Sequence, residues 1–212
     1  MDWIASAFDY LSRGGIVMVF ILIASIIGVS ISIERYFFLT NLRRSTKKLF
    51  SIAKEKIEKG NVRDILAICD TEKTVSSNIL RTAIDVYLKG LSKEEIERSI
   101  QDIAKIEMPI VNRYLYLLGT MVTVSPMLGL LGTVLGMIKA TSVLAEKGLA
   151  SPSELLTGIA EALITTAAGL IVAIPLLILY NYLANKSQEI IEEIEANVTE
   201  ILLLMSSSKS IW

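Results

Sequence analysis

The sequence contains no histidine and one cysteine, Cys69, among its 212 residues. A single cysteine forms no disulfide within the chain, and without histidine there is no plausible zinc site, so we expect neither a metal nor a cofactor. We interpret Cys69 as a small buried apolar residue. An excess of positive charge is also missing, because 21 Lys and Arg residues stand against 22 Asp and Glu residues. No basic patch interleaved with aromatics follows from this composition, and we exclude nucleic acid as a partner.

Hydrophobic residues, by contrast, make up 52% of the chain, and the mean hydropathy is +0.56. Charged residues are absent from three stretches, 14–33, 114–138 and 162–185. Each stretch reaches the roughly 18 residues at which a membrane-spanning helix explains an apolar run better than a buried core helix does. The sequence therefore predicts an all-α membrane protein with three transmembrane helices, for which membrane lipid is a partner.

The charges beside the first span predict its orientation. Arg13 precedes the span, whereas four basic residues follow it: Arg43, Arg44, Lys47 and Lys48. The positive-inside rule makes the more basic flank cytoplasmic, which gives an N-out, C-in chain. The first loop and the C-terminal helix then form a cytoplasmic helical bundle. We expect a periplasmic or interfacial amphipathic helix at 1–13, transmembrane helix 1 at 14–38, a cytoplasmic helical region at 39–112, transmembrane helix 2 at 113–138, a short periplasmic loop at 139–157, transmembrane helix 3 at 158–185 and a cytoplasmic C-terminal helix at 186–212.

Two local patterns predict how the cytoplasmic bundle is built. Ser92 and Glu95 have the spacing of a capping box, which predicts a helix from Lys93 onward. We expect this helix to run on into the second span, where Pro109 either kinks it or breaks it near the membrane surface. The C-terminal helix carries an apolar stripe that should pack on the cytoplasmic helices or on a neighbouring copy. The stripe consists of Ile190, Ile191, Ile194, Val198, Ile201, Leu202 and Met205.

The second span carries a stripe of small residues. At 100° per residue, one helix face collects Ser125, Gly129, Gly132, Thr133, Gly136 and Ala140. Small residues let helices approach closely in lipid, so tight packing is the expected role of the glycines. The hydroxyl of Thr133 fits either a packing hydrogen bond or a pore lining. Pro126 should bend the helix.

The third span holds a carboxylate, Glu161, in its first turn, although hydrocarbon strongly disfavours an ionised group. Thr165 and Thr166 follow it by one turn, and Gly169 and Pro175 lie further along. Polar groups of this kind face protein or water and often mark ion pathways, so the hypothesis is a proton or cation path. On a straight helix Thr165 lies about 40° and Thr166 about 140° around from Glu161, and both hydroxyls cannot point the same way as the carboxylate.

Two longer motifs in the second and third spans indicate a relationship to a known family. The second span contains SPMLGLLGTVLGMI and the third contains GIAEALITTAAGLIVAIPLLILYN. Both resemble the MotA/TolQ/ExbB proton-channel family, and its ExbB and TolQ members most closely. The resemblance also covers the three-span, N-out layout, whereas residues 1–112 resemble the family in layout only.

The resemblance implies a homopentamer in the bacterial inner membrane that surrounds a dimer of single-span subunits of the ExbD or TolR kind. Such a motor uses the proton motive force to energise a TonB-like or TolA-like envelope-spanning protein, for transport across the outer membrane or for envelope maintenance. By motif position Glu161 matches the third-span carboxylate, and Thr133 and Thr166 match the channel-lining threonines. Three further residues match by position: Pro126 and Pro175 as helix-bending prolines, and Asn181 as the asparagine near the cytoplasmic end.

Several alternatives stay open. This chain has threonine at both 165 and 166, where relatives often have alanine first, so helix geometry favours Thr165 as the lining residue and the resemblance favours Thr166. A MotA-like flagellar stator subunit shares the spans, although that branch typically has four. A non-conducting membrane scaffold would use the small-residue faces for assembly and Glu161 for a hydrogen bond to a neighbour. None of these readings is an enzyme.

Overall fold

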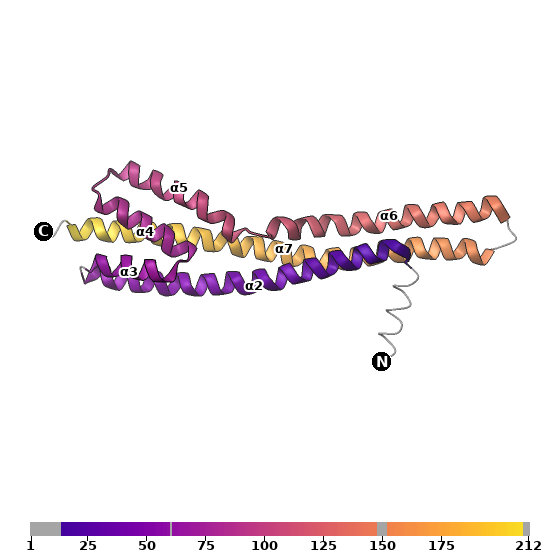
Figure 1. Cartoon of the computed structure of the whole chain (residues 1–212), viewed down its shortest axis with the longest axis horizontal. Helices are drawn as coiled ribbons and strands as arrows, with labels where there is room; N and C mark the ends of the chain where they lie inside the picture. The colour runs from indigo at the N-terminus through magenta and orange to yellow at the C-terminus, as the bar shows by residue number, and fades with distance from the viewer. Residues whose placement is uncertain (1–13, 60, 148–151, 210–212) are drawn as a thin grey trace, which may run out of the picture. The chain divides into compact units, whose positions relative to one another are not determined.

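The computed structural model describes residues 14–59, 61–147 and 152–209. These residues form helices and connecting turns, which confirms the predicted all-α class (Figure 1). The amphipathic helix expected at 1–13 lies outside the described residues. The helices are α2 Gly15–Glu58, α3 Val62–Glu72, α4 Val75–Leu88, α5 Lys93–Val111, α6 Leu115–Lys147 and α7 Pro152–Lys209.

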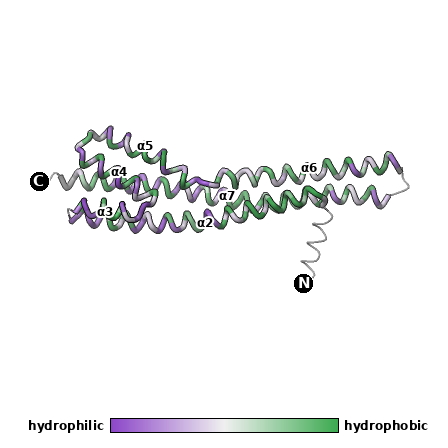
Figure 2. The backbone as a smooth tube through the Cα atoms, in the orientation of Figure 1, coloured by the Kyte–Doolittle hydropathy of each residue, from purple (hydrophilic) through white to green (hydrophobic). Residues whose placement is uncertain are grey.

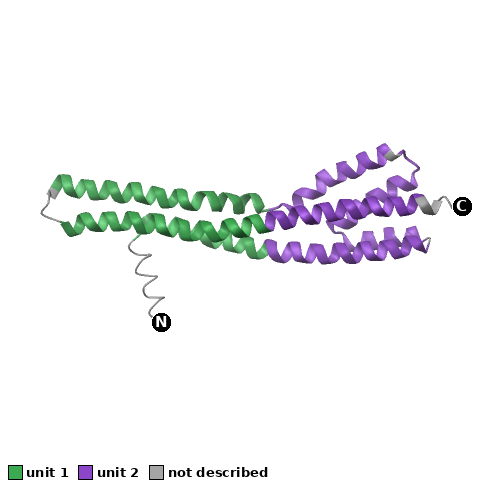
Figure 3. Cartoon of the chain, turned by 180° about the vertical axis from the view of Figure 1, so that it is seen from behind, with its two compact units in different colours: residues 1–34, 114–182 green, residues 35–113, 183–212 purple. Residues whose placement is uncertain are grey.

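The chain divides into two compact units, coloured separately in Figure 3. Unit 1 contains α2 up to Glu34, α6, and α7 up to Tyr182. Unit 2 contains α2 from Arg35, the three shorter helices α3 to α5, and α7 from Leu183. Two long helices therefore contribute to both units.

Among the residues that the structure describes, three helices are long and apolar enough to cross a membrane, namely α2, α6 and α7, which confirms the three predicted spans. Figure 2 shows their hydrophobic runs in green. The expected boundaries at 38/39 and 185/186 do not interrupt a helix, because α2 continues to Glu58 and α7 to Lys209. The sequence explains this continuity, since neither glycine nor proline occurs in 29–59 or in 176–209.

The helices beside the second connection are longer than expected. α6 continues to Lys147 and α7 begins at Pro152, so the prediction of a loop over 139–157 is wrong for most of its length. Residues 139–147 include Lys, Ala, Leu and Glu, which are strong helix formers. Pro152 occupies the first helical position of α7, where a missing N–H removes no hydrogen bond.

The helix that begins at Lys93 does not run on into the second span. α5 ends at Val111 and α6 begins at Leu115, so the expected continuous helix is wrong and the break is found instead. Pro109 supplies no N–H to the last turns of α5, which weakens the helix there. Tyr114 then adopts a φ of 65°, a left-handed conformation that a continuing helix does not contain.

Unit 2 is held by a parallel pairing of α2 and α7. Thr40 accepts a hydrogen bond from Lys186, and Lys54 pairs with Glu200 at 2.7 Å. Arg43 lies 3.2 Å from Glu193. Residues of the predicted C-terminal stripe are buried, with Leu202 partly exposed: Ile190, Ile191, Ile194, Val198, Ile201 and Met205. The stripe therefore packs within its own chain, which is the first of the two expected arrangements; the other was packing on a neighbouring copy.

The short helices of unit 2 are capped. Ser92 and Glu95 form the predicted capping box, with Glu95 accepting from the Ser92 backbone N–H at 2.9 Å. A second capping box, not predicted, joins Thr74 and Ser77 at the start of α4. Cys69 is buried as expected, and burial raises the pKa of its thiol to about 11. A protonated thiol of this kind is a packing residue and a poor nucleophile.

Unit 1 depends on an antiparallel contact between α6 and α7, which we call the glycine seam: Gly129, Gly132 and Gly136 on α6, and Gly158 and Gly169 on α7. A methyl group at Gly169 would lie 2.6 Å from the backbone oxygen of Ser125, and one at Gly136 would lie 2.7 Å from that of Gly158. Backbone atoms cannot give way as the end of a side chain can. These glycines therefore lie where the backbones of α6 and α7 come close together within the protomer, and their role in helix packing stays a prediction.

Thr74→Ala should weaken α4 by about 1 kcal/mol, because the cap satisfies backbone N–H groups that the helix leaves free. Hydrogen–deuterium exchange in the first turn of α4 should accelerate in this variant. Thr71→Ala is the matched control, since Thr71 is exposed on α3 and bonds to its own helix at Ala67. Equal exchange in both variants would contradict the cap.

Gly169→Leu should destabilise the α6–α7 contact by about 1–3 kcal/mol or more, because the added side chain meets the backbone of Ser125. Thermal unfolding of the detergent-purified protein measures the effect. Ala167→Leu adds similar bulk at an exposed position of the same helix and should have a smaller effect. Equal unfolding temperatures of the two variants would rule out the close contact between Gly169 and the backbone of Ser125.

Candidate ion-path site

Glu161 lies in the third turn of α7, not in its first turn, because α7 begins at Pro152. The positive end of its own helix therefore does not stabilise the carboxylate, since that effect fades beyond the first turn. Two other helices approach the carboxylate instead. Lys139 of α6 donates to Oε2 at 2.7 Å, and Oε1 lies against Gly15 at the start of α2. The Glu161 side chain is 20% exposed and the Lys139 side chain 60%.

Thr133 and Thr166 meet across the glycine seam. Their hydroxyl groups share a short hydrogen bond in which either oxygen can be the donor. Thr166 also lies 3.1 Å from the backbone oxygen of Gly129 on α6, and Thr133 lies 3.4 Å from that of Ala162 on α7. Both side chains are partly exposed. The pair therefore joins the two helices and keeps one side open to the surroundings.

Thr165 occupies a different environment. Its side chain is 1% exposed, and its hydroxyl donates to backbone oxygens of its own helix, at 2.9 Å for Ala162 and 3.1 Å for Glu161. A methyl group added at Gly132 would collide with it. Thr165 therefore fills the seam, while its neighbour Thr166 pairs with Thr133.

The remaining residues predicted from the sequence are prolines, an asparagine and glycines. Pro126 is partly exposed, while Pro175 and Asn181 are exposed. α6 and α7 are continuous helices through their prolines, and a bending role for these residues stays a prediction. Gly129, Gly132, Gly136 and Gly169 belong to the seam and position the threonines without offering chemistry of their own.

Lys139 is the site residue that sequence reasoning missed. The expected helix boundary at 138 placed it in a loop, where its partner could not be inferred. One signal was present: the small-residue stripe continues to Ala140, which indicates that the α6 helix extends past Lys139. With both helices extended, their antiparallel register brings Lys139 to Glu161.

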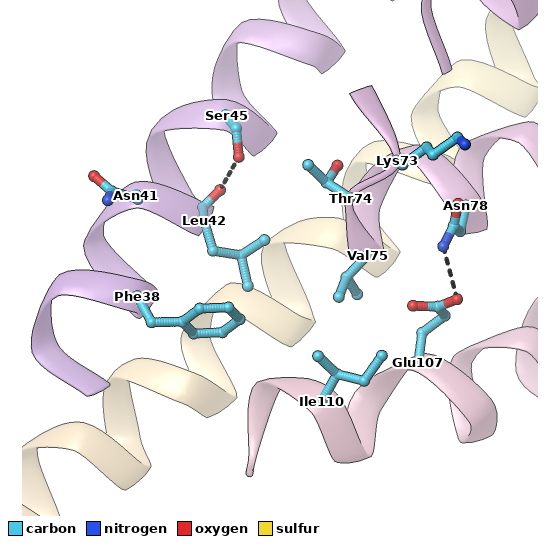
Figure 4. Close-up of a pocket in the computed structure, with 10 residues that line it drawn as sticks. All are labelled: Phe38, Asn41, Leu42, Ser45, Lys73, Thr74, Val75, Asn78, Glu107 and Ile110. Atoms are coloured by element: carbon cyan, nitrogen blue, oxygen red, sulfur yellow. Dashed lines mark hydrogen bonds between the residues drawn. The ribbon is translucent and has the colours of Figure 1, made fainter. Parts of the chain in front are cut away.

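Unit 2 contains a cavity of about 450 Å³ that is separate from these residues (Figure 4). α2 contributes Phe38 to its wall, α4 contributes Asn78 and α5 contributes Glu107. Glu107 is buried and accepts a hydrogen bond from the Asn78 amide at 2.8 Å. Glu107 is thus hydrogen-bonded to a neighbour in the cavity wall, and none of the residues predicted for the ion path lines the cavity.

Known proteins are similar to this chain over much of its length. The model of the MotA/TolQ/ExbB proton channel family matches residues 71–196, which include α6 and the membrane part of α7. An ExbB homolog of Methanothermobacter thermautotrophicus, named for biopolymer transport, is 30% identical over 196 residues, covering 92% of this chain and 69% of that protein. An ExbB-like protein of Synechocystis is 32% identical over 171 residues, covering 79% of this chain and 80% of that protein.

A third relative, the biopolymer transport protein ExbB of Aquifex aeolicus, is 39% identical over 117 residues, covering 55% of this chain and 77% of that protein. These relatives and the matching family model describe transport and channel proteins. Three apolar helices place the chain in a membrane. The chain belongs to the MotA/TolQ/ExbB proton channel family and has the general character of its ExbB-type members.

Proposed function

We propose that the chain is the channel subunit of an inner-membrane motor of the ExbB–ExbD or TolQ–TolR type. It uses the proton motive force to energise an envelope-spanning partner of the TonB or TolA kind. The observation that carries this proposal is the position of Glu161, an ionisable group in a membrane-spanning unit, close along α7 to the Thr133–Thr166 pair. One proton crossing 100 mV supplies about 2.3 kcal/mol, which is the work available per transfer.

The surface of the spans supports a ring of copies. In the most apolar 18-residue stretch of α6, 22% is buried inside the chain. The corresponding stretch of α2 is 33% buried. The exposed apolar side chains of α6 and α7 therefore need cover from lipid or from neighbouring chains. We infer a homopentamer with α6 and α7 inside, α2 toward lipid, and a dimer of single-span ExbD- or TolR-like subunits in the pore.

The threonine nearest the conduction path is Thr166 in this proposal. Its hydroxyl is partly exposed and bonded to Thr133, so the pair can pass a hydrogen bond between helices. Thr165 is buried and bonded to its own helix, which suits packing. Along the axis of α7, Thr166 lies about 7.5 Å beyond Glu161.

A flagellar stator of the MotA kind would use similar chemistry. The three candidate spans favour the ExbB or TolQ branch over it, and so do the ExbB names of the relatives.

Glu161→Ala should abolish energised function while insertion and ring formation persist, because the carboxylate is outside the glycine seam. Glu161→Asp should retain part of the activity. The measurement is motor-dependent growth or uptake in cells that lack their own copy, beside oligomer yield by native mass spectrometry. Glu146→Ala, an exposed carboxylate on α6, is the control. Normal function of Glu161→Ala would refute the ion path, and failure through lost assembly would favour a scaffold.

Thr166→Val and Thr133→Val should each reduce the same activity, because valine keeps the side-chain shape and removes the hydroxyl from the pair. Thr165→Val removes a hydroxyl that bonds only to its own helix and should function nearly as well as the parent chain. The reverse order, with Thr165→Val the more defective, would assign the lining role to Thr165.

A further inference from the structure

Lys139 is the cation that the structure brings to the Glu161 carboxylate. Its ammonium nitrogen lies 2.7 Å from Oε2, a charge-assisted hydrogen bond of good length. The two residues come from different helices and are 22 positions apart, so the pair depends on the register of the seam. Glu161 is 20% exposed and Lys139 60%, which leaves the ammonium able to turn toward water.

The second oxygen of Glu161 lies close to α2. Gly15 adopts a φ of +62°, and a methyl group built there would meet Oε1. The carboxylate thus lies between the start of α2 and the ammonium of α6, with a close neighbour at each oxygen. A carboxylate in this position has the small residue Gly15 on one side and a balancing charge on the other.

The pair contributes little to the stability of the fold. An ion pair in which one member is largely exposed is screened by solvent and competes with the entropy of a long side chain. Packing of α6 on α7 rests on the glycine seam instead. Losing the Lys139 charge should therefore leave the helices in place and change the position of the Glu161 carboxylate.

We propose that Lys139 is a positioning residue of the ion path, the resting counter-ion that holds Glu161 between α6 and the start of α2. The proposal rests on the proposed function, in which Glu161 takes part in conduction. When a proton reaches the carboxylate from water, it binds one oxygen and leaves a neutral carboxyl group beside a free ammonium group. Release of the proton restores the ion pair, so no other atom or charge is consumed.

A zero-length carbodiimide reaction tests the contact directly. In the full-length purified protein it should join the Lys139 amine to the Glu161 carboxyl as an amide, with loss of one water, which mass spectrometry of peptides detects. Lys54 and Glu200, also 2.7 Å apart, provide a positive control in the same sample. The amide should be missing from Lys139→Arg and Glu161→Gln. A Lys54–Glu200 amide without a Lys139–Glu161 amide would overturn the proposal.

The functional test compares Lys139→Met with Lys139→Arg in cells that depend on the motor. Lys139→Met should lower activity about tenfold, because a carboxylate displaced by even 1 Å is badly placed for transfer. Lys139→Arg keeps the charge and should retain most of the activity. In a Glu161→Asp background the shorter side chain has already lost the contact, so Lys139→Met should change the remaining activity by less than about twofold.

The outcomes distinguish the role of Lys139 from the ion path itself. Normal activity of Lys139→Met beside an inactive Glu161→Gln would overturn the role of Lys139 and leave the ion path standing. Normal activity of Glu161→Gln would overturn the ion path itself, whatever Lys139 does. An equal defect in Lys139→Met and Lys139→Arg would also overturn the counter-ion role, since the charge would not be what matters.

Discussion

The close approach of α6 and α7 is the constraint on which the rest of unit 1 depends. In lipid the hydrophobic effect does not drive helices together, so close contact has to come from backbone packing and interhelical hydrogen bonds. Glycines on both helices allow that contact, and a methyl group at Gly136 or Gly169 would meet backbone atoms. The same register brings Thr133 to Thr166 and Lys139 to Glu161. One packing contact thus builds both polar pairs of the site.

This arrangement explains how an ionisable group is accommodated beside apolar spans. An unpaired carboxylate in a membrane segment is costly, and such groups pair with a partner or face water. Glu161 has Lys139 at one oxygen and the start of α2 at the other, and its side chain keeps partial exposure. The group is therefore neither locked into the protein interior nor freely solvated. That intermediate state suits the role proposed for Glu161, in which the carboxylate gains and loses a proton.

Sequence predicted the parts of the fold that depend on composition. Long uncharged runs define the three spans, and the spacing of Ser92 and Glu95 defines a helix start. Helix ends were harder, because α6 continues past its apolar run through residues of high helix propensity. α7 likewise begins earlier than expected, so Glu161 lies in its third turn and not in its first. The different surroundings of Thr165 and Thr166 could not be predicted without the partner helix, because α6 covers Thr165 and supplies the hydroxyl that bonds to Thr166.

The central claim is that Glu161 carries protons. It is tested most directly by proton entry into liposomes that hold the full chain, purified from its own membrane with its bound subunits. A potassium diffusion potential, inside negative, supplies the driving force, and a trapped pH-sensitive dye reports acidification. We expect voltage-dependent acidification with the parent protein and only background acidification with Glu161→Gln at equal protein content. Equal rates of acidification in the two preparations would contradict the account.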